Sequence, residues 1–195
     1  MERVVEEAKK ITALPGFKGY IHDVGGPTAN FRYPACDRQL EHGVCANRKC
    51  LAPTPCKNLK VDHSEYMHLI EKIEALPRVK KVFIRSGIRF DYLMLDPDDA
   101  FFRKLVRDNV SGQLKVAPEH CSDNVLACMG KPGFAVYEAF REKFFRITKS
   151  LGKEQYLVPY LMSSHPGSTL ADAIELALCL KRNHYAPEQV QDYYP

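Results

Sequence analysis

Several features that would place this chain in a membrane or outside the cell are missing from its sequence. No apolar run approaches the roughly 18 residues that a membrane-spanning helix needs, and the N-terminal segment lacks the apolar core of a signal peptide. The seven cysteines are an odd number, unevenly spread, which suits thiols or metal ligands in a reducing compartment better than a disulfide framework. The sequence therefore predicts a soluble, cytoplasmic protein with no membrane partner.

A strong excess of charge is also absent. The chain has 28 basic and 24 acidic side chains and a formal net charge of +4, which permits an anionic ligand but does not require nucleic acid. It has no internal repeat and no low-complexity linker, so its length predicts one domain over residues 1–195. Within that domain, residues of about 27–63 form a cysteine-rich insertion, because they are too many for an ordinary strand-to-helix connection.

Helical and extended patterns alternate along the rest of the chain. Helical patterns cover 3–13, 64–76 and 134–150, a cap at Asp96–Asp99 predicts a helix that runs to about Asn109, and Thr169–Asp172 resembles a capping box for a helix ending near Arg182. Extended patterns cover 19–24, 81–86, 113–117, 155–162 and 190–194, and Pro159 suggests a bulge or an edge-like position in the fourth of them. This alternation predicts an α/β fold with a parallel sheet, either a closed or partly closed (β/α) barrel or an open doubly wound sheet.

The loops that follow these strands are polar and rich in glycine and proline. Ligands gather at the carboxyl ends of parallel strands, so these loops are the place to look for a site. Each loop alone could be an ordinary turn, but all five together indicate a binding site. The loops are Asp23–Thr28, Arg85–Arg89, Ala117–His120, Ser163–Gly167 and Asp192–Pro195.

Three of these stretches resemble the radical S-adenosylmethionine (SAM) enzymes, and the YgiQ-type proteins of that superfamily in particular. They are GGP after the strand at 19–24, LKVAPEHCSDNVLACMGKPG, and YLVPYLMSSHPGSTLADA with the ending QVQDYYP. They occur in order on successive strands, and the resemblance covers nearly the whole chain. It implies a partial (β/α) barrel that holds SAM on a [4Fe-4S] cluster, where reductive cleavage of SAM yields a 5′-deoxyadenosyl radical.

The resemblance also implies roles for the first two loops. Backbone oxygens of Gly25, Gly26 and Pro27 would meet the methionyl amino group of SAM, because adjacent glycines let a main chain approach a ligand closely. The guanidinium groups of Arg85 and Arg89 could pair with the carboxylate of SAM. The plain alternatives are a strained turn for the glycines and sheet-end ion pairs for the arginines.

The loops after the later strands would contact the nucleoside part of SAM. Glu119 lies where the family places polar groups near the ribose, and a helix-capping acid is the competing interpretation. Ser163, Ser164 and His165 lie where the family contacts the ribose or the adenine. A histidine in such a loop is more often packed or solvent-facing than catalytic.

The cluster of this superfamily needs three thiolates, normally as C-x3-C-x2-C after the first strand of the barrel. This chain contains no such triplet, and it opens on a helix instead of a strand. We therefore expect a radical SAM-like core that lacks its first strand and the cluster ligands and that does not cleave SAM by itself. The open edge left at residues 19–24 predicts self-association.

Four cysteines share the insertion and suggest a second kind of site. Cys36, Cys45, Cys50 and Cys56 stand among basic residues and could hold a zinc ion or an auxiliary iron–sulfur cluster, although their spacing also allows free reduced thiols or disulfides. The other three cysteines, Cys121, Cys128 and Cys179, fall on helical stretches, and we expect them to be small apolar residues of the core.

Two other functions fit parts of the sequence. A metal-stapled nucleic-acid-binding module would use the basic insertion, with Phe31 and Tyr33 stacking on bases. A metal-dependent barrel lyase would need acids or histidines at strand ends, where only Asp23, Glu119-His120 and His165 are present. Polarity concentrates at the strand ends and not on one continuous basic face, which favours the enzyme.

Overall fold

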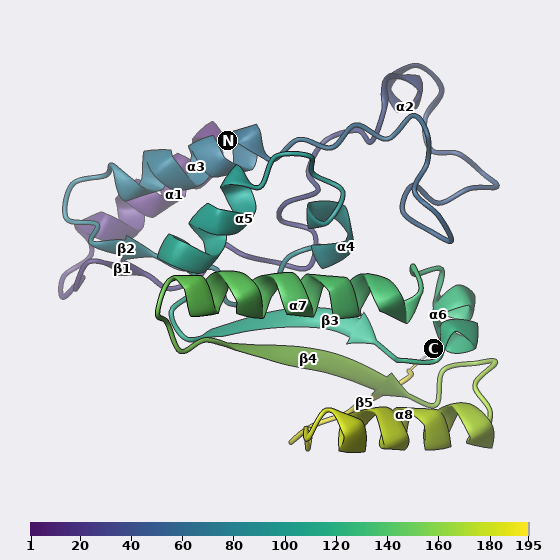
Figure 1. Cartoon of the computed structure of the whole chain (residues 1–195). Helices are drawn as coiled ribbons and strands as arrows, with labels where there is room; N and C mark the ends of the chain where they lie inside the picture. Colours follow the sequence, from purple (N-terminus) through teal and green to yellow (C-terminus); the bar gives the residue numbers. More distant parts are fainter. Residues whose placement is uncertain (195) are drawn as a thin grey trace. The chain divides into compact units, whose positions relative to one another are not determined.

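The computed structural model describes residues 1–194, and its helices and strands alternate as the sequence predicts (Figure 1). The α-helices are α1 (Glu2–Ala13), α2 (Asp37–His42), α3 (Ser64–Glu74), α4 (Phe90–Leu93), α5 (Ala100–Lys104), α6 (Asp123–Met129), α7 (Phe134–Ser150) and α8 (Leu170–Arg182), and a π-helical turn, η1 (Leu105–Asn109), continues α5. The strands are β1 (Tyr20–Ile21), β2 (Lys81–Val82), β3 (Gln113–Glu119), β4 (Tyr156–Ser163) and β5 (Gln191–Asp192).

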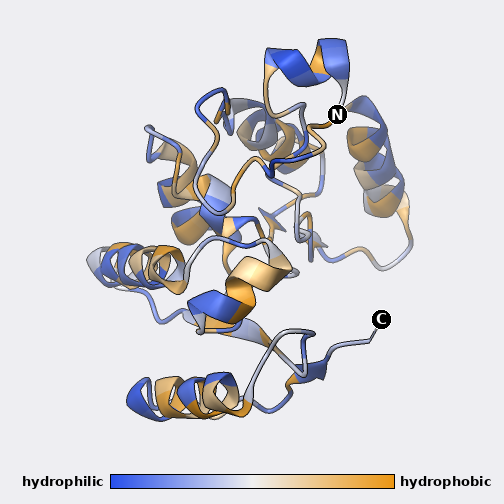
Figure 2. Ribbon diagram, turned by 90° about the vertical axis from the view of Figure 1, so that its right-hand side faces the viewer, coloured by the Kyte–Doolittle hydropathy of each residue, from blue (hydrophilic) through white to orange (hydrophobic). Residues whose placement is uncertain are grey.

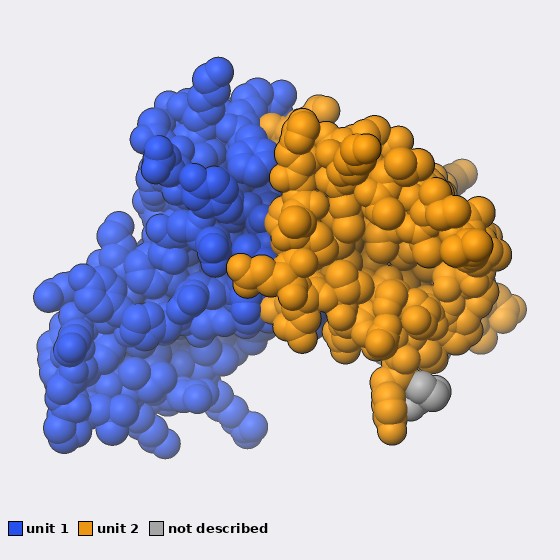
Figure 3. All heavy atoms as spheres, turned by 90° about the horizontal axis from the view of Figure 1, so that it is seen from below, with its two compact units in different colours: residues 1–32, 61–116, 143–158 blue, residues 33–60, 117–142, 159–195 orange. Residues whose placement is uncertain are grey.

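The chain divides into two compact units, which are coloured separately in Figure 3. Unit 1 comprises residues 1–32, 61–116 and 143–158, and unit 2 comprises residues 33–60, 117–142 and 159–195. The division falls within β3, α7 and β4. Each unit is described below by itself.

In unit 1 the strands follow one another in chain order. Strand β1 pairs in parallel with β2, with Tyr20 opposite Lys81 and Ile21 opposite Val82. Backbone hydrogen bonds extend this pairing past the strand ends, because the Val24 N–H donates to the Phe83 carbonyl at 2.9 Å. Beyond β2, the Lys115 N–H of β3 donates to the Arg85 carbonyl at 3.3 Å. The carboxyl ends of β1 and β2 therefore lie next to one another, and the segment after β2 lies beside β3.

The core of unit 1 is built from helix faces packed on these strands. Helix α1 packs on α3, and α3 packs on β2. The spacing of apolar residues in α3 places one stripe of the helix inward, as expected for an amphipathic helix. The fully buried large side chains of this unit include Leu69, Ile70, Ile73, Ile84, Leu93, Phe101, Phe102, Leu105, Leu114 and Phe144.

In unit 2, β5 pairs in parallel with the end of β4, with Met162 opposite Gln191 and Ser163 opposite Asp192. Helix α8, at the bottom of Figures 1 and 2, alternates hydrophobic and hydrophilic residues along its length. Its inward residues Leu176 and Cys179 form a small core with Cys121 and Leu161. This core fixes the two strand ends that carry the candidate residues of unit 2.

These observations define a mixed α/β fold with short parallel sheets. Residues 1–194 contain no closed barrel. Among the same residues, no helix is both long enough and apolar enough to cross a membrane.

One expectation about an individual element needs correction, and two short helices were not predicted. The helix expected after Asp96–Asp99 is present, since α5 starts at Ala100 with Asp99 as its N-cap residue and the Asp98 carboxylate accepts the Ala100 N–H at 2.9 Å. Residues 105–109 then form a π-helical turn instead of continuing the α-helix. Short helices α2 and α4 were not predicted, since four to six residues carry too little periodicity to be recognised.

Two expectations about the cysteines outside the insertion also need correction, one about burial and one about helical structure. Cys128 is exposed, because it lies on the outer side of α6, whereas Cys121 and Cys179 are buried as predicted. Cys121 itself precedes α6 and is not helical.

Candidate functional site

The carboxylate of Asp23 ties the loop after β1 to the loop after β2. Its Oδ1 accepts hydrogen bonds from the N–H groups of Gly25 at 2.8 Å and Arg85 at 2.9 Å, and its Oδ2 accepts from the Ser86 N–H at 3.1 Å. Burial acts to raise the pKa of Asp23, but the hydrogen bonds from Ser86, Arg85 and Gly25 outweigh it and lower the pKa below the usual value. Asp23 is therefore an ionised clamp between two strand ends.

The two adjacent glycines after β1 have different surroundings. A Cβ at residue 25 would lie 2.8 Å from Asp23 Oδ1 and 3.0 Å from both Gly87 O and Ile84 Cγ2, so only glycine fits there. A Cβ at residue 26 would meet only the Ala29 Cβ, at an ordinary 3.8 Å. Packing within the chain therefore requires Gly25 but leaves space beside Gly26.

A third glycine, Gly87, lets β3 lie close to the loop that follows β2. Gly87 has φ +110°, and a Cβ there would lie 2.9 Å from the Lys115 carbonyl of β3. The Gly26 N–H donates to the Gly87 carbonyl at 2.9 Å. The loops after β1 and β2 and the middle of β3 at Lys115 thus approach to distances that side chains would prevent.

The two predicted arginines of unit 1 have different environments. The guanidinium of Arg89 faces Asp91, with Nε 2.8 Å from Oδ1 and a terminal nitrogen 2.7 Å from Oδ2, and this pairing with Asp91 raises the pKa of Arg89. The side chain of Arg85 is exposed. The backbone of Arg89, in turn, is held by the side chain of Asn30, whose Oδ1 accepts the Arg89 N–H at 2.6 Å.

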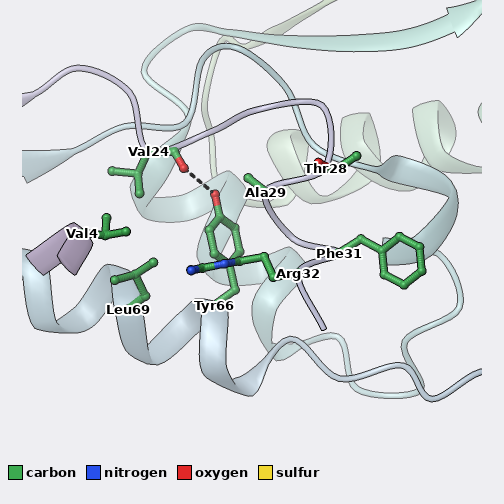
Figure 4. Close-up of a pocket in the computed structure, with 8 residues that line it drawn as sticks. All are labelled: Val4, Val24, Thr28, Ala29, Phe31, Arg32, Tyr66 and Leu69. Carbon is green, nitrogen blue, oxygen red and sulfur yellow. Dashed lines mark hydrogen bonds between the residues drawn. The ribbon is translucent and has the colours of Figure 1, made fainter. Parts of the chain in front are cut away.

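A pocket of about 450 Å³ lies beside the same loop (Figure 4). The loop contributes Val24, Thr28 and Ala29 to its lining, and helix α3 contributes Tyr66, whose hydroxyl donates to the Val24 carbonyl at 2.9 Å. Burial raises the pKa of Tyr66 to a value at which the hydroxyl stays protonated, which preserves this bond. Arg32 is the charged residue of the lining, and the other lining residues are Val4, Phe31 and Leu69.

In unit 2, the end of β3 is strained at a predicted site residue. Glu119 has φ +67°, a left-handed conformation that costs energy for a residue with a Cβ. Its carboxylate pairs with Lys131 Nζ at 2.9 Å, and the same Nζ donates to the Ala117 carbonyl at 2.6 Å. Lys131, which the sequence analysis did not single out, holds the strained turn.

The end of β4 is fixed by β5. The hydroxyls of Ser163 and Ser164 donate to the carboxylate of Asp192, and Ser164 has φ +59°. The imidazole of His165 lies edge-on to the Tyr193 ring with centroids 5.1 Å apart. Ser163, Ser164 and His165 thus contact Asp192 and Tyr193. Pro195, which belongs to the last predicted loop, lies outside the described residues.

The four cysteines of the insertion lie in one neighbourhood. Burial raises the pKa of the Cys50 thiol, and the neighbouring Cys56, Cys36 and Cys45 raise it further, so Cys50 interacts electrostatically with the other three. The Cys56 N–H donates to the Cys50 carbonyl at 2.9 Å. Across residues 1–194, however, no three His, Cys, Asp or Glu side chains stand in an arrangement ready to ligate a metal ion.

Several basic and aromatic residues proposed for nucleic acid already have partners within the chain. Lys60 pairs with Asp37 at 2.6 Å, and Arg48 donates to the carbonyls of Thr54 and Pro55. The ring of Phe31 stacks on Tyr92 with centroids 4.5 Å apart. The first two contacts lie within the insertion, and the ring contact of Phe31 lies within unit 1.

The predicted residues thus form two groups, one in each unit. Gly25, Gly26, Pro27, Arg85 and Arg89 share the strand ends of unit 1, and Glu119, Ser163 and His165 share those of unit 2. The sequence analysis missed the side chains that hold these loops, which are Asn30, His63, Asp96 and Lys131. No local pattern identifies them, because their partners lie 12 to 59 residues away.

The class of protein defined by these observations is a mixed α/β protein whose parallel strands end in hydrogen-bonded, glycine-rich loops. Comparison with known proteins finds relatives over the whole chain. The chain is 61% identical over 194 residues to a "UPF0313 protein" of Clostridium perfringens strain ATCC 13124 and 60% identical to a protein of the same name from Clostridium botulinum strain Okra. It spans 29% and 30% of the length of these two relatives. No family model and no solved structure matches the chain.

Proposed function

We propose that the chain forms part of the core of a radical SAM enzyme, as a partial (β/α) barrel without the first strand of that fold. The order of the strands supports this proposal, because β1 pairs with β2, the segment after β2 bonds to β3 through the Arg85 carbonyl and the Lys115 N–H, and the second sheet has the order β3-β4-β5. A doubly wound sheet would reverse its strand order at a switch point. An order without reversal is what a singly wound barrel wall needs.

The observation that carries the proposal is the difference between Gly25 and Gly26. Packing explains glycine at 25 but not at 26, where a side chain would have space. A ligand that approaches the backbone at this point supplies the missing reason. The Gly26 carbonyl accepts the Ala29 N–H at 3.1 Å, so we assign the carbonyls of Gly25 and Pro27 to the methionyl amino group of SAM.

The charged and strained residues are assigned to the carboxylate, the ribose and the adenine of SAM. Arg85 is exposed at the same strand end, and we assign it to the SAM carboxylate, while the pairing of Arg89 with Asp91 makes Arg89 a support of the loop. For Glu119 and the Ser163–His165 turn of unit 2, the resemblance alone supports an assignment to the ribose and the adenine. Left-handed backbone at Glu119 and Ser164 supports a functional role, since such strain concentrates at binding sites.

The thiols of this chain do not fit the catalytic cluster. Cys45, Cys50 and Cys56 are separated by four and five residues, whereas the cluster motif has gaps of three and two. We therefore place the cluster ligands elsewhere in the full-length protein. When bound there, the cluster would supply the electron that cleaves SAM to methionine and a 5′-deoxyadenosyl radical. The role of this chain is to bind and orient SAM.

Anaerobic assay of SAM cleavage tests the proposal. The full-length protein, reconstituted with iron and sulfide and reduced with dithionite, should convert SAM to 5′-deoxyadenosine and methionine. The 195-residue chain treated in the same way should not. A full-length protein that contains a spectroscopically verified cluster but forms no 5′-deoxyadenosine would contradict the enzyme assignment, and cleavage by the short chain alone would contradict the placement of the cluster ligands.

A second candidate function is favoured by the gathering of Cys36, Cys45, Cys50 and Cys56. We propose that these thiols close around a zinc ion or an auxiliary iron–sulfur cluster, which would order a segment in which α2 buries no residue. Metal analysis of the purified protein should find close to one zinc, or several irons, per chain, and Cys50→Ser should lose that metal. The exposed Cys128→Ser is the control and should keep it. Metal below about one tenth of stoichiometry in the wild type would exclude this site.

A further inference from the structure

The side chain of Asn30 links the Gly25–Pro27 loop to the segment after β2. Asn30 is 3% exposed, and its amide makes two hydrogen bonds to one backbone residue: Oδ1 accepts the Arg89 N–H at 2.6 Å, and Nδ2 donates to the Arg89 carbonyl at 3.0 Å. This two-point contact can form in only one orientation of the amide, because the Arg89 N–H must face an oxygen. The orientation of Asn30 is therefore set by the backbone.

That orientation determines the protonation of a buried histidine. The remaining hydrogen of Asn30 Nδ2 points to His63 Nε2, 3.1 Å away, so Nε2 must be an acceptor without a proton. The proton of the neutral ring is then on Nδ1, which donates to Asp96 Oδ2 at 2.5 Å. Asn30, His63 and Asp96 form a continuous chain of hydrogen bonds, and we call this chain the Asn30–His63–Asp96 relay.

The surroundings of the relay exclude water and hold the ring. His63 is 2% exposed and stacks on Phe101, with ring centroids 5.0 Å apart and planes 7° from parallel. On another side it contacts Tyr92 at 4.9 Å between centroids. Without water as a substitute partner, each hydrogen bond of the relay depends on the next.

We propose that Asn30, His63 and Asp96 are positioning residues that hold the Gly25–Pro27 loop against the Arg85–Arg89 segment in the conformation that binds SAM. The inference rests on the proposed function, since it assigns the relay to the same ligand site. If His63 Nε2 carried a proton, it and Asn30 Nδ2 would both be hydrogen-bond donors, and no hydrogen bond could form between them. Asn30 could then keep the contact to His63 only by turning its amide over, which would break both hydrogen bonds to Arg89.

The relay should make ligand binding sensitive to pH. The groups that face the His63 ring are the carboxylates of Asp96 and Asp62, the hydroxyl-bearing ring of Tyr92, the Phe101 ring and the Asn30 amide. Burial lowers the pKa of His63 more than the two carboxylates raise it. The ring is therefore neutral at pH 7, and its protonation in acid should displace the loop.

The test measures SAM affinity of the full-length, cluster-containing protein from pH 7.5 down to 5.5 by equilibrium binding. Wild type should lose affinity as the pH falls, whereas His63→Gln, which cannot take up the proton, should bind about tenfold more weakly at pH 7 and show no such loss. Tyr66→Phe is the matched control, because it removes one buried hydrogen bond to the same loop but leaves the relay intact. It should keep the wild-type pH profile.

The outcomes separate this inference from the function on which it rests. The relay would be overturned if His63→Gln kept the affinity and the pH profile of the wild type. It would also be overturned if Tyr66→Phe changed the pH profile in the same way as His63→Gln. Neither result would affect the finding that the protein binds SAM. Failure of the wild type itself to bind SAM at any pH would overturn the proposed function, and the inference with it. A second variant, Asp96→Asn, keeps an acceptor for His63 Nδ1 and should retain more affinity than His63→Gln; equal loss in both would also contradict the relay.

Discussion

At the scale of single residues, the strand ends of unit 1 depend on two glycines and one aspartate. Gly25 and Gly87 allow backbone atoms to approach to distances that a Cβ would prevent, and Asp23 fixes them there by accepting three N–H groups. None of these interactions is a feature of a helix or strand ladder. They are the reason that the strands end in an ordered set of loops.

The first prediction concerns the two adjacent glycines. Gly25→Ala should destabilise the protein by about 1–3 kcal/mol, because its methyl group would overlap Gly87 O and Ile84 Cγ2, whereas Gly26→Ala should change stability by less than about 0.5 kcal/mol. Urea unfolding of both variants measures the difference. Equal stabilities for the two variants would show that the close approach at Gly25 is absent in solution.

The second prediction is the pH dependence of the Asp23 clamp. The pKa of Asp23 is lowered from 3.8 in the folded protein, so its contribution to stability is complete above that value and is lost as the pH falls through the lower, folded pKa. Asp23→Asn should melt about 2–4 °C below wild type at pH 7, and this gap should shrink as the pH falls below about 4. Thermal unfolding monitored by circular dichroism at several pH values checks both points, and a gap that widens in acid would contradict the assignment.

At the scale of elements, periodicity predicted the long helices and failed where local interactions compete. Helices α1, α3, α7 and α8 have amphipathic patterns over eleven or more residues and were predicted within three residues at each end. The segment at Asp96 has the composition of a helix start, but its carboxylate is used by His63 33 residues away. The helix nevertheless begins at Ala100, directly after the predicted cap, and what the sequence did not show is that residues 105–109 form a π-helical turn.

The prediction made for Pro159 is confirmed in part. The sequence suggested a bulge or an edge-like position, and β4 runs through Pro159 as the middle strand in the order β3-β4-β5. However, β5 pairs with β4 only at Met162 and Ser163. Along the β5 side, Pro159 thus meets no ladder hydrogen bond that its missing N–H would break.

The third prediction concerns the start of α8. The sequence suggested a capping box, and the structure confirms it, with the Thr169 side chain accepting from the Asp172 N–H and the Asp172 carboxylate accepting from the Thr169 N–H at 2.8 Å. Thr169→Val keeps the shape but removes the hydroxyl, and it should lower the melting temperature by about 2–4 °C. Ser168→Ala, one residue earlier and outside the box, is the control. Equal melting of the two variants would mean that the cap contributes nothing.

At the scale of the whole molecule, the sequence predicted the polar loops after the strands but not the contacts that hold them. Strand alternation predicted that Gly25, Arg85, Glu119 and Ser163 lie at or after strand ends, and each of them does. The supporting contacts, Asn30 to His63 and Lys131 to Glu119, join residues 33 and 12 positions apart and follow no period. The resemblance to radical SAM enzymes supplied the roles, and the relatives named UPF0313 protein extend over the same residues.

The central claim is that SAM approaches the Gly25–Pro27 loop through the space beside Gly26, and the most direct measurement is the SAM affinity of the full-length protein with Gly26→Ala. Because residue 26 has space for a methyl group in the folded chain, the account predicts a variant as stable as wild type that binds SAM at least tenfold more weakly. Unchanged affinity in a normally folded Gly26→Ala protein would show that the ligand does not approach this loop, and the proposed site would be wrong.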